Sequence, residues 1–174
     1  MRSRTVTLIG LVLVAAFLAG TTTPALGALP TWLTSTERTA IRHAPHPYLR
    51  TQCVNHNPIV VRVARRTTIG THHVIVAQVM CKYGTSGAPV ETSVYGHRDG
   101  AWHQLYRLES GRVVQRPRYW ITAVQSLRLH GRRVVLPYDG YRASDALCCP
   151  SRRYHRVFHL RWGSFTRGAL VRDN

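Results

Sequence analysis

Cysteine is the residue type with the clearest potential chemistry in this chain of 174 residues. The cysteines include no Cys-x-x-Cys pair, which is the spacing of a zinc ribbon or of a thioredoxin-like redox site. In an exported protein, an even number of cysteines instead favours disulfides. The set consists of Cys53, Cys81, Cys148 and Cys149.

Three pairings of these cysteines are possible. A bond between the adjacent Cys148 and Cys149 closes a strained ring, so this pairing is the least favoured of the three. Neighbouring side chains of an extended segment point to opposite sides of the chain. We therefore expect Cys148 and Cys149 to bond to different partners, one to Cys53 and the other to Cys81, in either order.

Ten histidines raise the question of a metal site. His155 and His159 lie on the same face of an expected strand, but their spacing separates them by about 13 Å, too far for one ion. Pro45 prevents regular helical spacing between His43 and His46. We therefore predict no metal site and no cofactor.

Ser86, in the segment 84–87, is the candidate nucleophile for a hydrolase. The elbow pattern G-x-S-x-G is absent, because a glycine follows Ser86 directly. His97 or His103 could join Asp99 and Ser86 in a triad, but nothing in the sequence brings these residues together. The seven carboxylates are scattered, without the paired motif that glycosidases need. We predict no catalytic residues and no enzyme, with a Ser86 hydrolase as a less favoured alternative.

The chain carries 24 Lys and Arg residues against 7 Asp and Glu, a formal net charge of +17. Arginine has the planar fork that suits phosphate groups. We predict a weak polyanion-binding site for anionic components of the cell envelope. The alternative ligand is extracellular nucleic acid, which requires Tyr119, Trp120 and Tyr154 to be exposed for stacking on bases. The candidate binding residues are Arg116, Arg118, Arg152, Arg153 and Arg156.

Residues 1–27 have the layout of a secretory signal peptide, with a basic start, an apolar run and small residues before Ala28. The apolar run at 8–20 is shorter than the roughly 20 residues of a membrane-spanning helix. No cysteine precedes Cys53, so the segment lacks a lipobox. We therefore predict a secreted protein, free or associated with the cell wall, with no transmembrane segment in the mature chain.

One short helix and a series of strands must position these residues. Residues 28–45 are expected to form a linker and a helix that is capped at 34–36 and ends before Pro45. Alternation of apolar and polar residues dominates residues 46–174, and the Asp99-Gly100 step indicates a hairpin. We predict strands at 59–64, 73–83, 90–97, 102–108, 113–115, 121–129, 132–136 and 154–162.

The last of these strands should place Tyr154, Phe158, Leu160 and Trp162 on one face, interrupted by Arg156. His155, His159 and Arg161 should lie on the other face. The segment from Pro137 to the cysteine pair is expected to be a loop. Consecutive strands with tight turns predict an antiparallel meander with one open face, its other face partly covered by the helix and long loops. The predicted fold class is therefore α+β, mostly antiparallel sheet with one short N-terminal helix, in a single disulfide-stabilised domain.

Motifs around the cysteines resemble the actinobacterial LppP/LprE family of secreted and lipid-anchored envelope proteins. Residues 81–90, CKYGTSGAPV, precede a strand that ends in HRDGAW at 97–102, and residues 145–154, DALCCPSRRY, precede a strand that ends in RWGSF at 161–165. The likeness covers residues 53–165. It implies a small extracytoplasmic domain with structural disulfides and brings no catalytic residues, while the missing lipobox distinguishes this chain from the lipoproteins. We predict a non-enzymatic binding or interaction domain at the cell envelope.

Overall fold

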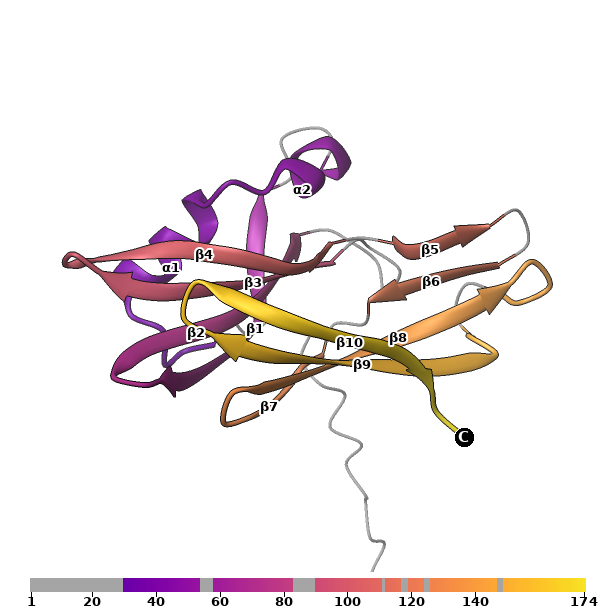
Figure 1. The fold of residues 1–174 in the computed structure, drawn as a ribbon. Coiled ribbons are helices and arrows are strands. Elements are labelled where there is room, and N and C mark those ends of the chain that lie inside the picture. Colours follow the sequence, from indigo (N-terminus) through magenta and orange to yellow (C-terminus); the bar gives the residue numbers. More distant parts are fainter. Residues whose placement is uncertain are drawn as a thin grey trace, which may run out of the picture.

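The computed structural model describes residues 30–53, 58–82, 90–110, 112–116, 119–123, 126–146 and 149–174. In these residues the chain forms two antiparallel β-sheets and two short helices (Figure 1). The predicted α+β fold, mostly antiparallel sheet, is therefore confirmed. The predicted signal peptide and Ser86 lie outside the described residues.

The first sheet is a four-stranded meander with the order β1-β2-β3-β4. Its turns need backbone conformations that glycine adopts readily: Asp99 and Gly100, between β3 and β4, both have positive φ angles, 51° and 77°. The Asp-Gly hairpin expected from the sequence is thus confirmed. The strands are β1 (Ile59–Ile69), β2 (His72–Cys81), β3 (Val90–Arg98) and β4 (Ala101–Ser110).

The second sheet has the order β10-β9-β8-β6-β5, with β7 also paired to β8. Since β4 ends at Ser110 and β5 begins at Arg112, the chain passes from one sheet to the other across a single residue. The strands are β5 (Arg112–Arg116), β6 (Tyr119–Ala123), β7 (Arg128–His130), β8 (Arg133–Arg142), β9 (Arg152–Arg161) and β10 (Ser164–Arg172).

Two helices precede the strands. α1 (Ser35–His43) begins with a capping box, in which the Thr34 hydroxyl accepts from the Glu37 amide and the Glu37 carboxylate accepts from the Thr34 amide. α2 (Pro47–Gln52) was not predicted. Its first residue is a proline, which is well suited to the first turn because no partner for its amide is needed there.

Two apolar cores separate three layers of structure. One core lies between the two sheets and includes Val76 and Val94 from the first sheet and Leu136 and Phe158 from the second. The other lies between the helices and the opposite face of the first sheet. Consequently β2 is buried from Val74 to its end. The expected meander with one open face is wrong for this sheet, since both its faces are covered.

Several boundaries differ from the sequence prediction. The segment 137–142, expected to be a loop, continues β8, because Tyr138 and Gly140 pair with both β6 and β9. The expected strand at 121–129 is divided between β6 and β7. β10 was missed: it is an edge strand, largely exposed, so its sequence lacks a clear apolar face.

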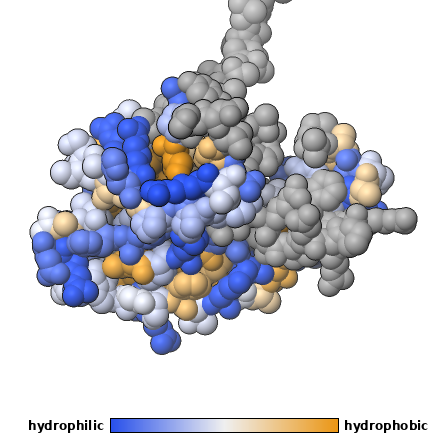
Figure 2. Space-filling model, turned by 90° about the horizontal axis from the view of Figure 1, so that it is seen from above, coloured by the Kyte–Doolittle hydropathy of each residue, from blue (hydrophilic) through white to orange (hydrophobic). Residues whose placement is uncertain are grey.

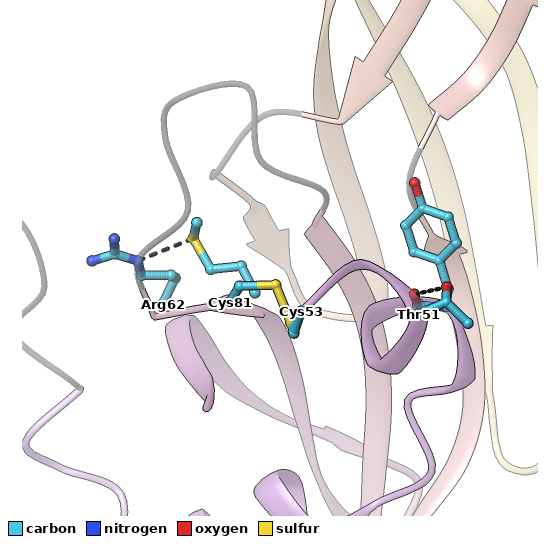
Figure 3. Close-up of a disulfide and its surroundings, with 6 residues drawn as sticks. Thr51, Cys53, Arg62 and Cys81 are labelled. Carbon is cyan, nitrogen blue, oxygen red and sulfur yellow. Dashed lines mark hydrogen bonds between the residues drawn. A yellow bond between two sulfur atoms is a disulfide. The ribbon is translucent and has the colours of Figure 1, made fainter. Parts of the chain in front are cut away.

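The disulfide pairing also differs from the prediction. Cys53 bonds to Cys81, with a Cα–Cα distance of 5.4 Å (Figure 3). The physical reason is that Cys53 ends α2, and the chain then returns as β1, whose first residue, Ile59, pairs with Cys81. Cys149 is disulfide-bonded too, and Cys148 lies outside the described residues. The expected bonds from Cys53 and Cys81 to the adjacent cysteine pair are therefore wrong.

Candidate functional site

Arg156, one of the five predicted binding arginines, is buried between the sheets. It is 9% exposed, and its Nη1 lies 2.7 Å from Oε2 of Glu109. The guanidinium also lies 5.8 Å from the ring centre of Tyr138, whose pKa is raised by burial and by the Glu109 charge. Arg156 is therefore occupied inside the fold and is not available to an external polyanion.

The other four predicted arginines lie in different surroundings. Arg152 is partly buried and Arg153 is exposed, both at the start of β9. Arg153 lies opposite Asp139 of β8 in the strand register. Burial raises the pKa of Asp139 above its usual value, and the Arg153 charge only partly opposes this shift. Arg116 ends β5 but its side chain is not described, and Arg118 lies outside the described residues. Among the three predicted arginines whose side chains are described, only Arg153 is exposed, so these three do not form one surface site.

Tyr154, one of three aromatic residues expected to be exposed for stacking on nucleic-acid bases, is buried. This residue is 9% exposed and belongs to the core between the sheets, so its predicted exposure is wrong. Tyr119 and Trp120 begin β6, but their side chains are not described. The reason for the burial is the alternation along β9, which turns Tyr154, Phe158 and Leu160 to the inside, as the sequence predicted.

The same alternation turns basic side chains to the outer face of the second sheet. Arg133 pairs with His130 on one side and with His159 on the other, so these three residues cross β7, β8 and β9 in one row. Arg128 and Arg161 lie two residues away along β7 and β9 and thus share this face. All five side chains are exposed. We call this set, Arg128, His130, Arg133, His159 and Arg161, the basic face.

Most of the described carboxylates have partners away from the basic face, and Asp139, on the same side of β8 as Arg133, lies opposite Arg153. Glu91 is fully buried, Glu109 binds Arg156 and Arg167, and Asp173 binds His155. Within the described ranges, none of the three arginines of the basic face takes part in an ion pair. Neighbouring strands lie about 4.8 Å apart, so Arg128, Arg133 and Arg161 place three positive charges on one face of three adjoining strands.

Apolar residues are dispersed among the coloured residues of the face shown in Figure 2. On the face shown in Figure 2, hydrophilic residues in blue alternate with small patches of apolar residues in orange. Trp32, 40% exposed, and Val171, 48% exposed, are the large apolar side chains that stand out among the described residues. The described residues visible in this view therefore form no single broad apolar patch.

A cleft of about 330 Å³ opens between α1 and one end of the first sheet. Arg66 and Glu37 form an ion pair in it, 2.6 Å between Nη2 and Oε2, and Trp32 packs on the guanidinium at 4.5 Å. Burial raises the pKa of Glu37, but hydrogen bonds from the Thr34 amide and from Arg66 outweigh it and hold this pKa below its usual value. His73, His97 and Trp102 also line the cleft.

Sequence reasoning missed this cleft, although one signal was present. The two-residue turn at Asp99-Gly100 necessarily sets His97 opposite Trp102 on β3 and β4, and the structure has this pairing. The two rings meet edge to face with centres 5.4 Å apart. His73 and Arg66 lie on β2 and β1, and no local pattern in the sequence shows that α1 would close over them.

A polar cluster centred on the fully buried His46 and Glu91 links the helices to β3. His46 Nδ1 lies 2.7 Å from Glu91 Oε1, and its Nε2 lies 2.7 Å from the Ile41 carbonyl oxygen. Arg107 Nε lies 3.2 Å from the same carboxylate oxygen. Because His46 and Glu91 are both 0% exposed, no substrate reaches them, and the cluster joins the helices to the first sheet.

The structure describes three of the four residues named for the alternative hydrolase, because Ser86 lies outside the described residues. Asp99 is bonded to Arg98 in the exposed β3–β4 turn, and His97 and His103 lie on β3 and β4. Over the described ranges, no group of three or more His, Cys, Asp or Glu residues is arranged to hold a metal ion. In the same ranges, no helix is long and apolar enough to cross a membrane.

No family model, no curated protein and no solved structure matches this chain. The resemblance to the LppP/LprE family therefore stays a prediction from the sequence motifs.

Proposed function

We propose that the protein is a secreted, non-enzymatic binding domain whose basic face attaches it to anionic, phosphate-bearing components of the cell envelope. The observation that carries the proposal is the basic face itself, with three exposed arginines and two histidines on adjoining strands. The signal-like N-terminus, the family resemblance and the Cys53–Cys81 disulfide support a location outside the cytoplasm, where such bonds persist.

Charge and geometry together favour phosphate as the recognised group. Arg133 is offset by one strand and two residues from both Arg128 and Arg161. The resulting separation of about 8 Å is comparable to the Debye length at physiological salt, so the fields of these charges overlap. Each guanidinium can bind two phosphate oxygens at once. A regular sheet also holds the arginines at fixed spacing, which reduces the entropy lost when a polymer or a lipid surface binds.

The test compares two triple variants that remove the same charge. The first variant replaces the arginines of the basic face, Arg128, Arg133 and Arg161, with Gln. The second replaces three exposed arginines elsewhere, Arg42, Arg50 and Arg98, with Gln. Binding to vesicles of phosphatidylglycerol and phosphatidylcholine should fall roughly 100-fold in the first variant, since each basic residue contributes about 1 kcal/mol near an anionic surface. The second variant should bind nearly as the unmodified protein does.

Equal losses in both variants would show that only net charge matters and would contradict a specific face. A parallel titration with single-stranded DNA separates the ligand classes. Tighter binding to DNA than to the vesicles at the same salt concentration, with a steep salt dependence, would instead favour the nucleic-acid alternative.

A further inference from the structure

We propose that the cleft beneath α1 binds an uncharged sugar unit, with Trp102 as its platform and the imidazoles of His73 and His97 as its hydrogen-bonding groups. The cleft lies on the helix side of the first sheet, whereas the basic face lies on the outer side of the second sheet. The inference is therefore independent of the proposed function.

The ring-bearing side chains of the cleft form a row across three strands. His97 of β3 lies directly opposite Trp102 of β4, and the pair Val74↔Gly96 places His73 of β2 at the adjoining position on the same row. Three strands span about 10 Å. The volume of about 330 Å³ lies at the lower end of the range typical of small-molecule sites.

The polar groups of the cleft suit hydroxyls better than charges. In the described residues, neither His73 nor His97 makes a hydrogen bond with its ring, although both line the cleft. A neutral imidazole offers one donor and one acceptor, and a hydroxyl group can satisfy both. Arg66 and Glu37 neutralise each other, so the cleft lacks the net charge that would select an anion.

The apolar part of the cleft suits one face of a sugar ring. An indole has a negatively polarised face, which attracts the weakly positive C–H groups of a saturated ring. Trp102 lines the cleft and is only partly buried, so part of its indole is accessible to a ligand. A sugar ring has an apolar C–H face that can pack on the Trp102 indole and a rim of hydroxyls that can hydrogen-bond to the imidazoles of His73 and His97.

The test titrates the full-length ¹⁵N-labelled protein with maltose, cellobiose and N,N′-diacetylchitobiose, followed by amide shifts and tryptophan fluorescence. We expect at least one of these to bind with a dissociation constant of about 1 mM, with shifts centred on His97, Trp102 and Glu37. His73→Ala and His97→Ala should each weaken binding about tenfold. His103→Ala is the matched control, because His103 is exposed on β4 but neighbours Trp102 in sequence and so points to the opposite face.

Four results would overturn the proposal, and three of them come from the sugar titrations. These are the absence of saturable shifts with all three disaccharides, an equal loss of binding in His103→Ala, and shifts that centre on the basic face. A fourth is saturation of the cleft by inorganic phosphate without any response to sugars, which would make it an anion site. Sugar binding should be retained in the triple variant of Arg128, Arg133 and Arg161. The same variant therefore separates a failure of polyanion binding by the basic face from a failure of sugar binding by the cleft.

Discussion

Trp162, in the turn between β9 and β10, lies directly against Gly96 of β3. A Cβ atom on Gly96 would be 2.8 Å from two ring atoms of Trp162 and 2.8 Å from the Leu105 side chain. The indole also stacks on His72 with ring centres 3.9 Å apart. One aromatic side chain of the second sheet is thereby held against the backbone of the first, and Gly96 makes this approach possible.

Replacing Gly96 with Ala should destabilise the fold by about 1–3 kcal/mol, because the added methyl group overpacks this contact. The measurement is urea unfolding followed by circular dichroism. In a Trp162→Ala background the same change should cost clearly less, since most of the clash is removed. Equal costs in both backgrounds would show that Trp162 does not limit the space at Gly96.

The Cys53–Cys81 pairing can be checked directly by peptide mapping. Trypsin should release residues 51–62, 67–82 and 143–152 as separate segments, each carrying different cysteines. Without reduction, mass spectrometry should find 51–62 linked to 67–82. A link from either of them to 143–152 would contradict the observed connectivity.

Loss of this disulfide should lower stability by about 3–4 kcal/mol on the chain-entropy model, because the bond closes a loop with a sequence separation of 28. The Cys53→Ala/Cys81→Ala double variant, compared with the unmodified protein in chemical denaturation, measures this loss. Chemical reduction is a poorer test, since Cys149 is also disulfide-bonded. An unchanged free energy of unfolding would show that α2 is held to β2 by packing alone.

The buried pair of His46 and Glu91 should be far more sensitive than an exposed pair of similar chemistry. Glu91→Gln removes the carboxylate between His46 and Arg107. We expect a loss of about 3 kcal/mol, because the buried His46 ring and the Arg107 guanidinium then both lose this shared partner. Asp99→Asn is the control: Arg98 and Asp99 are 70% and 79% exposed, and the expected change is under about 1 kcal/mol. Similar losses in both variants would refute this difference.

Glu37 should contribute to the loss of stability in acid. Its pKa in the folded chain is lowered from 4.5, despite burial, by the Thr34 and Arg66 hydrogen bonds. The folded state therefore binds fewer protons than the unfolded state, so this contribution is complete above pH 4.5 and disappears as the pH falls through the lower, folded value. Glu37→Gln and Arg66→Gln should both flatten the curve of unfolding free energy against pH on its acid side. Curves parallel to that of the unmodified protein would show that the ion pair is not the cause.

Local features of the fold were accessible from the sequence because they depend on neighbouring residues. The cap at Thr34, the Asp99-Gly100 turn and the two faces of β9 follow from short-range hydrogen bonds, backbone angles and side-chain alternation. Edge strand β10 was not accessible in the same way, because an exposed edge needs no regular apolar pattern.

The candidate sites were accessible only in part. The alternation along β9 already separated His159 and Arg161 from the core residues, but it could not show that β7 and β8 would bring Arg128 and Arg133 beside them. Arg156 was predicted to bind an external polyanion, although its place on the apolar face of β9 was a sign of burial. Its partner Glu109 is 47 residues away in the chain, and only packing of the two sheets unites them.

The sequence by itself determined the basic charge, the class of fold and the faces of individual strands, because these follow from composition and from residues close together in the chain. Only the tertiary structure decided which cysteine bonds to Cys53, which arginines remain exposed and that a cleft forms under α1. These outcomes depend on which faces of the helices and the two sheets pack against one another after the chain passes from the first sheet to the second at Ser110. Such contacts join residues far apart in the chain, and no local sequence pattern specifies them.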